Sequence, residues 1–271
     1  MKLGYIDYLN CYPLYYHMME KEPVADVKIV SGYPSELNRM MIEGELDMSP
    51  ISSASYPEIV EEVVLLPDFC LSSVGYVQSV ILISRHPIEH LHQKRVGLSS
   101  ASKSSVVLLQ MLLQKYYKVE PVYLPSGPMP SLSDEGLDAA LVIGNEALMP
   151  SKEPVSYSYD LGDLWLQKTG FPVVFAVFAV RLSSIDKYAP QLKAVLNSYS
   201  RSLRCLDIER EALIRKAKER YAAIKYDVGL YYQLLRYKLT PELKEGLGFY
   251  LNLARELGLV KKFKSLRFMR R

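Results

Sequence analysis

The sequence predicts an α/β protein with two lobes and a cleft between them, and three features of the chain lead to this prediction. In the first two thirds of the chain, apolar runs of strand length alternate with segments of helical periodicity, which is typical of α/β sheets. From Ile185 onward the pattern becomes helical. No low-complexity linker divides the 271 residues, so extended strands rather than a flexible tether must join the two lobes.

Turn and cap residues separate the expected elements. Pro13 opens the first helix, because proline suits the first helical position, and Gly44 and Gly170 end later helices at C-cap positions. Strands are expected at residues 3–6, 27–30, 46–51, 63–66, 76–84, 95–98, 122–124 and 139–143. Further helices are expected at residues 35–43, 104–117, 160–168, 185–206 (with Ser184 as N-cap), 208–221, 228–238 and 241–257.

Two β-rich segments, residues 80–85 and 174–181, are the expected crossings between the lobes. With these crossings, one lobe consists of residues 1–85 and 178–271, and the other of residues 86–177. In sheets with parallel strands, ligands bind at the carboxyl ends of the strands. The cleft is therefore expected where the strands of the two lobes end.

The composition excludes several classes of protein. The net charge is only +3, and the basic residues within 261–271 are interpreted as a solvated tail rather than a nucleic-acid patch. The longest apolar run, residues 173–180, has the length of a buried strand and is too short to span a membrane. We expect no signal peptide before the first strand, and Cys11, Cys70 and Cys205 lack metal-ligand spacing. We expect a cytoplasmic protein with free thiols that binds neither nucleic acid nor membrane.

Motifs for a metal or a nucleotide cofactor are missing from the sequence. It contains no phosphate-binding glycine motif and no nucleophile elbow. His86, His90 and His92 lie close together, but without a matching carboxylate or cysteine they are interpreted as surface residues. His17 is also expected to be exposed. We therefore expect no metal and no cofactor.

Hydroxyl and amide side chains gather at the ends of the expected strands. A strand-to-helix turn offers free backbone N–H groups and the positive end of a helix dipole, so it can hold a carboxylate. A single serine there is more often a plain helix cap, and Ser102 or Ser104 is expected to be one. Repetition at four strand ends nevertheless predicts a shared anion-binding cleft. The residues are Asn10, Ser52, Ser53, Ser79, Ser99, Ser100, Ser102, Ser104, Ser105, Gly144 and Asn145.

Two further groups of residues have competing interpretations. Asp7 could act as a base, but an aspartate at a strand end more often accepts backbone N–H bonds in a turn, and we favour that structural role. The chain has 21 tyrosines against 7 phenylalanines. Tyr231, Tyr232 and Tyr237 lie at helical spacing and are interpreted as core or half-buried residues.

Several motifs, in order along residues 1 to about 181, resemble one known family. They include GYIDYLN at 4–10, GYPSELN at 32–38, GELDMSPISS at 44–53 and YDLG at 159–162, together with Ser79. This combination is similar to the chorismate dehydratases of the futalosine pathway. The helical C-terminal part contributes less to the resemblance.

The resemblance implies a type II periplasmic-binding-protein-like fold, with two mixed sheets flanked by helices. It also implies chorismate as substrate and 3-[(1-carboxyvinyl)oxy]benzoate as product, in the first step of the futalosine route to menaquinone, by a monomer or homodimer. Asn10 and Ser79 match the functional asparagine and serine of that family, and the turn at 99–105 matches a carboxylate-binding segment. Substrate binding is expected from Ser52, Ser53, Ser100, Ser104, Ser105, Gly144 and Asn145.

The implied reaction makes a ring aromatic, so the protein must mainly position the ring, remove the C3 proton and help hydroxide leave C4. The matched motifs contain no histidine or glutamate that could serve as a base. Our hypothesis is that the enolpyruvyl carboxylate of the substrate removes the proton.

Three alternatives share the expected fold. An importer's solute receptor would need export, and no export signal is expected. A later enzyme of the same pathway would differ in its opening motif. The effector domain of a transcription regulator would need a DNA-binding module, and none is expected.

Overall fold

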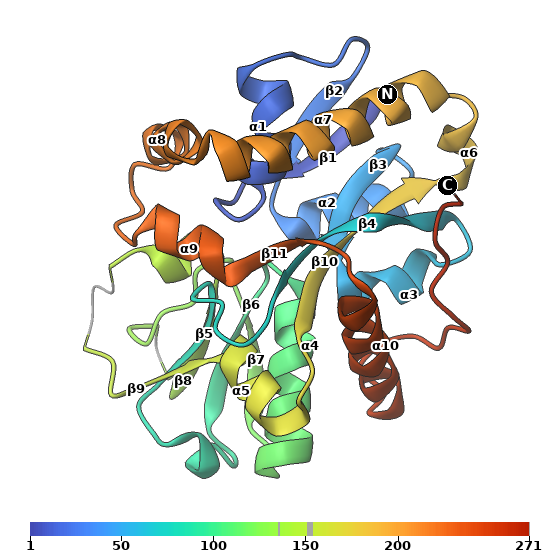
Figure 1. Ribbon diagram of the computed structural model, residues 1–271. Helices are drawn as coiled ribbons and strands as arrows, with labels where there is room; N and C mark the ends of the chain where they lie inside the picture. Colours follow the sequence, from blue (N-terminus) through green and yellow to red (C-terminus); the bar gives the residue numbers. More distant parts are fainter. Residues whose placement is uncertain (135, 151–153, 271) are drawn as a thin grey trace.

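The computed structural model describes residues 1–134, 136–150 and 154–270, and it shows two lobes, each built on one mixed β-sheet (Figure 1). The sheet of the first lobe has the strand order β11-β4-β10-β3-β1-β2. Its strands are β1 Lys2–Ile6, β2 Lys28–Gly32, β3 Met48–Ser52, β4 Val63–Ser73, β10 Val173–Arg181 and β11 Leu235–Lys238. The expected α/β class with two mixed sheets is confirmed.

The sheet of the second lobe has the order β7-β6-β8-β5-β9. Its strands are β5 Val80–Ser84, β6 Arg95–Ser99, β7 Val122–Ser126, β8 Ala139–Ile143 and β9 Tyr157–Asp160. The sequence pattern did not predict β9, an edge strand that pairs only with β5. Tyr157 and Ser158 are both exposed, so this short strand has no apolar run to indicate it.

The first three strands place polar turns at the cleft. β1 runs parallel to β2 and β3, so their carboxyl ends lie at one edge of the sheet. Helix α1 Tyr12–Glu20 follows β1 with Pro13 in its first turn, as predicted. Helix α2 Pro34–Ile42 follows β2 and is succeeded by Gly44 at φ +79°, a conformation that glycine adopts without strain. The turns after β1 and β3 therefore carry Asn10 and Ser52 to the same edge.

The chain passes between the lobes at residues 74–79 and 170–172, not within the two segments that we expected to cross. β5 pairs with β8 and β9 in the second sheet, whereas β10 pairs along its length with β3 and β4 in the first. Each of these strands is flanked by two antiparallel neighbours within a single sheet, which satisfies its backbone hydrogen bonds there. The boundaries between the lobes therefore lie earlier in the chain than residues 85 and 178, where we expected them.

Two helices of the second lobe begin beside the cleft. Helix α4 Lys103–Met111 follows β6 and continues as a wider π-helical turn, Leu112–Tyr117. Helix α5 Leu161–Thr169 begins at the predicted Asp160 and ends at Gly170, whose φ is +75°. Both predicted helices are confirmed.

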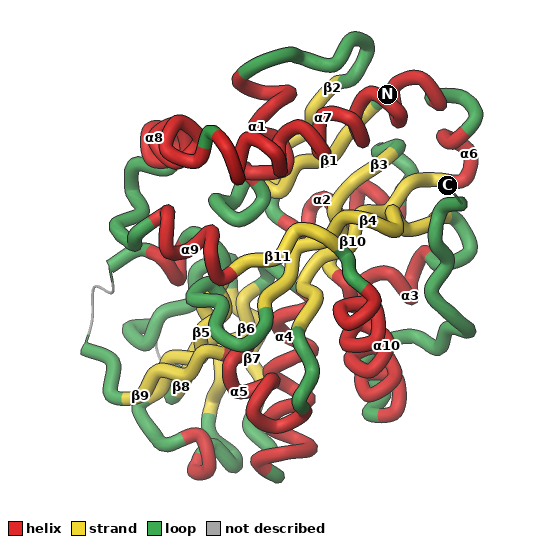
Figure 2. The backbone as a smooth tube through the Cα atoms, in the orientation of Figure 1, coloured by secondary structure: helices red, strands yellow, loops and turns green. Residues whose placement is uncertain are grey.

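From residue 182 to residue 256 the chain forms helices and one strand, β11, whereas the described residues after 256 form a loop (Figure 2). Residues 235–238, expected as the end of a helix, form β11 against β4, and their side chains alternate between buried and exposed. The expected N-cap Ser184 lies instead in a short helix, α6, and the next helix begins at Ala189 with Pro190 in its first turn. The helices are α6 Leu182–Ile185, α7 Ala189–Ile208, α8 Arg210–Arg220, α9 Val228–Leu234 and α10 Pro241–Glu256.

Aromatic and polar contacts hold α1 and α7 together over the first sheet. The ring of Tyr199 packs 5.1 Å from Tyr15 and 5.4 Å from Phe178, measured between centroids. His17 was expected to be exposed, but its side chain is only 13% exposed, because it lies between α1 and α7 and hydrogen-bonds Ser198. The three cysteines are buried and free, as expected. None of the helices in the described part of the chain combines the length and apolar character that a membrane crossing requires.

Candidate functional site

A cavity lies between the two lobes, where β1, β3, β6 and β8 end and β5 begins. Its volume is only ≈ 40 Å³, which holds a few water molecules at most, so the lobes are closed on one another. A ring-shaped metabolite can enter only when the lobes separate. The lining residues are Ile6, Tyr8, Asn10, Pro34, Ser52, Leu71, Ser79, Val80, Ser102, Ser105, Ile143, Gly144, Phe175 and Ala176.

Ser79 lies at the start of β5 on the wall of this cavity and is 2% exposed. Its Oγ accepts a hydrogen bond of 2.8 Å from the hydroxyl of Tyr231 in α9. The carbonyl of Ser79 accepts a hydrogen bond of 2.8 Å from the N–H of Gly144. This bond joins the start of β5 to the turn after β8. Ser79 is therefore held through both its side chain and its backbone.

Asn10 lies in the turn between β1 and α1 and also lines the cavity. Its Oδ1 is buried and has no hydrogen-bond partner among the described residues. Burial raises the pKa of Tyr231, while the side chains of Ser79 and Asn10 lower it, which places both beside the tyrosine hydroxyl. The structure thus brings the two predicted catalytic residues together around a third side chain.

Asp160 holds the chain segment that leads into Ser79. One carboxylate oxygen accepts the N–H groups of Val77 and Gln78 at 3.0 and 2.7 Å. The other accepts those of Gly162 and Asp163 at 2.9 and 3.1 Å, as the N-cap of α5. Burial raises the pKa of this carboxyl, and the four N–H groups offset part of that rise. The connection between the lobes at residues 74–79 is therefore anchored by the Asp160 side chain.

The two serines after β3 have different environments. Ser52 lines the cavity, but its Oγ accepts the amide of Asn38 at 3.1 Å and its N–H donates to Asn38 Oδ1 at 2.9 Å. Ser53 does not line the cavity: its hydroxyl donates to the carbonyl of Val174 at 2.6 Å and fastens the turn to β10.

The start of α4 brings an uncapped helix end to the cavity. Ser102 occupies the N-cap position, yet its side chain makes no capping hydrogen bond, and Ser105 donates to it at 3.3 Å. Both line the cavity. Since no side chain caps the first turn, its backbone N–H groups are available to a carboxylate.

The other two serines of this turn do not line the cavity. The Ser104 Oγ accepts the N–H of Ala54 in the first lobe at 3.2 Å. Ser100 is exposed, and its backbone N–H donates to Gly127. Ser104 therefore contributes to packing between the lobes, and Ser100 lies on the surface of the second lobe.

The turn after β8 touches the first lobe. Gly144 has a φ of +72°, and a Cβ there would lie 2.4 Å from the ring of Tyr8, so only glycine fits. Asn145 does not line the cavity; its Oδ1 accepts the N–H of Leu9 at 2.8 Å and its Nδ2 donates to the carbonyl of Asp7 at 3.4 Å. Asn145 therefore connects the lobes beside the cavity, and we call this contact, together with those of Lys103 and Ser35 between the lobes, the mouth.

Further contacts close the mouth. Lys103 at the start of α4 forms an ion pair with Glu58 of the first lobe at 2.5 Å. The N–H of Ser35 donates to the carbonyl of Ala101 at 3.1 Å. These contacts join the two lobes, and only the closed arrangement of the lobes can make them.

Glu146 is the carboxyl group next to this mouth. Burial raises its pKa, while its own backbone N–H and the Tyr8 hydroxyl lower it. Burial likewise raises the pKa of Tyr8, and the Glu146 carboxylate raises it further. Glu146 is absent from the residues that line the cavity.

We favoured a role for Asp7 as an acceptor of backbone N–H bonds in a turn, but the partners that the structure gives its carboxylate are side chains. Its Oδ1 accepts the Tyr221 hydroxyl at 2.9 Å and lies 3.5 Å from the Arg220 guanidinium. His86 pairs with Asp138 at 3.1 Å rather than with the other histidines of the 86–92 cluster. Within the described residues, no three His, Cys, Asp or Glu side chains are grouped to hold a metal ion.

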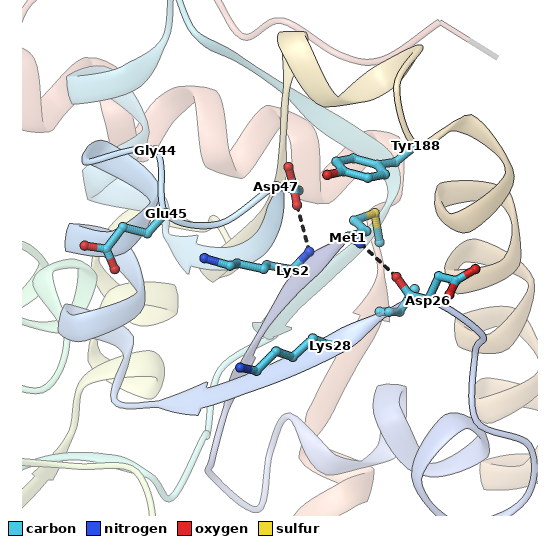
Figure 3. Close-up of a pocket in the computed structure, with 9 residues that line it drawn as sticks. Met1, Lys2, Asp26, Lys28, Gly44, Glu45, Asp47 and Tyr188 are labelled. Carbon is cyan, nitrogen blue, oxygen red and sulfur yellow. Dashed lines mark hydrogen bonds between the residues drawn. The ribbon is translucent and has the colours of Figure 1, made fainter.

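A second hollow, of ≈ 550 Å³, lies at the amino ends of β1 and β2, away from the cavity between the lobes (Figure 3). Its polar groups bind one another: the N-terminal ammonium donates to the carbonyl of Asp26 at 2.8 Å, and the N–H of Lys2 donates to Asp47 at 2.7 Å. Ligands of α/β sheets bind at the carboxyl ends of strands, so this hollow is not the candidate site.

Residues 1–256 match the sequence model of a protein family described as menaquinone biosynthesis. The chain belongs to the menaquinone biosynthesis family. Chorismate dehydratase of Thermus thermophilus is 32% identical to it over 201 residues, which are 66% of this chain and 69% of the relative. A 1,4-dihydroxy-6-naphtoate synthase of Streptomyces coelicolor is 25% identical over 244 residues, 82% of each chain.

This member of the menaquinone biosynthesis family also resembles solved structures of binding proteins. The alkanesulfonate-binding protein SsuA of Xanthomonas axonopodis superposes with a TM-score of 0.65 at 13% identity, over 97% of this chain and 94% of its own. At that identity the likeness shows the fold alone. The fold is the type II periplasmic-binding-protein-like fold that the motifs implied.

The sequence does not reveal two residues of this family member that hold Ser79 or the segment leading into it. Tyr231 looked like one more core tyrosine, because nothing in a sequence pairs it with a serine in another lobe. Asp160 was recognised as a helix start, but its bonds to Val77 and Gln78 were not. A glycine two residues after it, in the YDLG motif, is consistent with a helix start and gives no signal for the second pair of bonds.

Proposed function

We propose that this chain is a chorismate dehydratase, which removes water from chorismate to form 3-[(1-carboxyvinyl)oxy]benzoate in the futalosine route to menaquinone. Membership of the menaquinone biosynthesis family and the 32% identical chorismate dehydratase support the proposal. The observation that carries it is that Asn10 and Ser79, which come from different lobes, line one closed cavity. A cytoplasmic location is part of the proposal, supported by membership of a biosynthetic family.

The cavity offers a distinct surface to each part of such a substrate. Leu71 and Phe175 present apolar side chains to the ring. The uncapped first turn of α4, with Ser102 and Ser105, offers N–H and hydroxyl donors to a carboxylate. Asn10 retains an unpaired oxygen that can accept the C4 hydroxyl. These contacts fix the ring in one orientation, and positioning of this kind supplies several kcal/mol of the barrier reduction.

The lining contains no His, Asp, Glu, Lys or Arg among the residues that the structure describes. The base is therefore the enolpyruvyl carboxylate of the substrate itself, which takes the C3 proton. The electron pair of that C–H bond enters the ring, and the C4–O bond breaks to release hydroxide, which takes up the proton as water. Closure of the lobes excludes solvent and strengthens the hydrogen bonds to the charge that develops.

Incubation with chorismate tests the proposal directly. The expected product is aromatic and lighter than chorismate by one water, so ultraviolet absorbance and mass spectrometry both detect it. Binding of chorismate without turnover would contradict the enzyme and favour a receptor. Turnover of a later intermediate of the route, with none of chorismate, would instead favour the reaction of the naphtoate synthase relatives.

A further inference from the structure

Tyr231 connects the C-terminal helices to the cavity. It lies in α9, is 1% exposed, and donates its hydroxyl proton to Ser79 Oγ at 2.8 Å. Asn10 lies beside the same hydroxyl and lowers the pKa of Tyr231. The tyrosine thus stands behind the two residues from which the proposed catalytic pair is built.

The hydrogen bonds of Ser79 limit the directions in which its hydroxyl proton can point. A hydroxyl has one proton to donate and two lone pairs with which to accept. Because Tyr231 gives its proton to Ser79 Oγ, the Ser79 proton must point elsewhere. Its intramolecular acceptor is the carbonyl of Val77 at 3.5 Å, at the outer limit for an O–H donor. The remaining direction is the cavity that Ser79 lines.

Burial also keeps Tyr231 in the donating form. The tyrosine is surrounded by protein, and its pKa is raised, mainly by this burial, so it stays protonated throughout the physiological range. Within the described residues, the acid that acts on it by charge is Asp160, which raises the pKa further. The Ser79 Oγ therefore always has a donor on its inner side.

We infer that Tyr231 is a positioning residue, which orients the Ser79 hydroxyl as a hydrogen-bond donor toward the substrate oxygen that leaves or accumulates charge. This inference rests on the proposed dehydratase function of Asn10 and Ser79. It extends the site by a residue from the helical C-terminal part, which the family motifs in the first two thirds of the chain do not reach.

The neighbouring Tyr232 supplies a matched control. It is also buried in α9, at 3% exposure, but its hydroxyl has no hydrogen-bond partner among the described residues. Tyr231→Phe and Tyr232→Phe each remove one buried hydroxyl from the same helix and keep the ring. The two variants therefore differ in the contact with Ser79.

Steady-state kinetics with chorismate test the inference in the full-length protein. Tyr231→Phe is expected to lower kcat about tenfold, the effect of losing one oriented hydrogen bond, with KM within about twofold. Tyr232→Phe is expected to keep the wild-type kcat. Both variants are expected to remain folded, with a slightly lower Tm for Tyr231→Phe because only this variant loses a hydrogen bond. In a Ser79→Ala background, Tyr231→Phe is expected to have no further effect on kcat, because it acts through the serine.

Each other outcome overturns the inference. Full activity of Tyr231→Phe would show that Ser79 needs no partner. An equal loss in Tyr232→Phe, or an undiminished loss in the Ser79→Ala background, would show a general effect on packing. These results are distinct from failure of the proposed function, which would appear as absence of chorismate turnover by the wild-type protein and would overturn both.

Discussion

Two groups of polar residues border the cavity and differ in their hydrogen bonds: the lining pair Asn10 and Ser79, which we call the floor, and the residues of the mouth. At the floor, Asn10 has an oxygen without a partner among the described residues, and Ser79 accepts the Tyr231 proton while its own hydroxyl has only the long bond of 3.5 Å to the Val77 carbonyl. At the mouth, Asn145 and Lys103 are bound to groups of the opposite lobe. The same kind of side chain therefore serves a ligand in one region and holds the protein closed in the other. The difference lies in which hydrogen bonds are already made.

The two regions depend on one another through closure. Mouth contacts form only when the lobes are together, and floor contacts with a substrate gain strength when water is excluded. A change at the floor should therefore alter the rate of the bound complex, whereas a change at the mouth should alter how readily that complex forms. The variants below separate these two effects.

The largest effect is expected at the floor. Ser79→Ala removes a donor aimed at the reacting part of the substrate, and loss of one such donor lowers kcat about 100-fold or more. Steady-state kinetics with chorismate measure the change. The matched control is Ser53→Ala, another buried serine, whose hydroxyl bonds the Val174 carbonyl outside the cavity. It should lose about 1 kcal/mol of stability and keep its kcat. Equal losses of kcat in Ser79→Ala and Ser53→Ala would contradict the distinction between a serine that lines the cavity and one that bonds only to protein groups.

Asp160→Asn is expected to loosen the segment that carries Ser79 into the floor. The amide replaces one carboxylate oxygen by an NH₂ group, which cannot accept the two N–H bonds made there, so about 2 kcal/mol of unfolding free energy is lost. Denaturant unfolding measures the loss, and kcat should fall with it. Asp163→Asn, in the same helix turn, where the side chain of Asp163 accepts a bond from Gln167, should change stability by about 0.5 kcal/mol. A stable Asp160→Asn protein with full activity would show that Asp160 does not anchor the segment that carries Ser79.

A smaller effect is expected at the mouth. Asn145→Ala removes the bond to the Leu9 N–H and destabilises the closed arrangement by about 1 kcal/mol, so KM should rise about fivefold while kcat changes little. Asn197→Ala, on the exposed side of α7, should leave both constants unchanged. If kcat fell instead and KM stayed constant, Asn145 would belong to the floor.

Local patterns predicted most of the fold because strands and helices in this chain follow their own periodicity. The predictions failed where a distant partner decides the structure. Residues 235–238 continue a helical pattern, yet pairing with β4 makes them a strand. The crossings between lobes were placed inside β5 and β10, because the two long apolar runs do not reveal that their ladder partners lie in one sheet.

The site was predicted in part for the same reason. Asn10, Ser52, Ser79, Ser105 and Gly144 line the cavity, as expected of residues at strand ends. Ser53, Ser100, Ser104 and Asn145 share that sequence position but bond to protein groups or lie exposed. Which partner a hydroxyl finds depends on the closed lobes, and no spacing along the chain records it.

The smallest effect is expected beside the mouth, from Glu146→Gln. Burial raises the pKa of Glu146 above its ordinary value of 4.5, so the folded protein holds the proton more tightly than the unfolded chain. The protonated group thus contributes stability below pH 4.5, and this contribution is lost as pH rises through the folded pKa. Glutamine removes the titration.

Glu146→Gln should therefore match the wild type in unfolding free energy below pH 4.5 and exceed it slightly at pH 8. Thermal unfolding between these pH values measures the difference, and Glu256→Gln, exposed near the end of α10, is the control without a pH-dependent gain. The effect on KM should be minor, because Glu146 does not line the cavity. A loss of stability at pH 8 would mean that the Tyr8 hydroxyl stabilises the charged carboxylate by more than burial costs, and Glu146 would then join Asn145 among the groups that hold the lobes together.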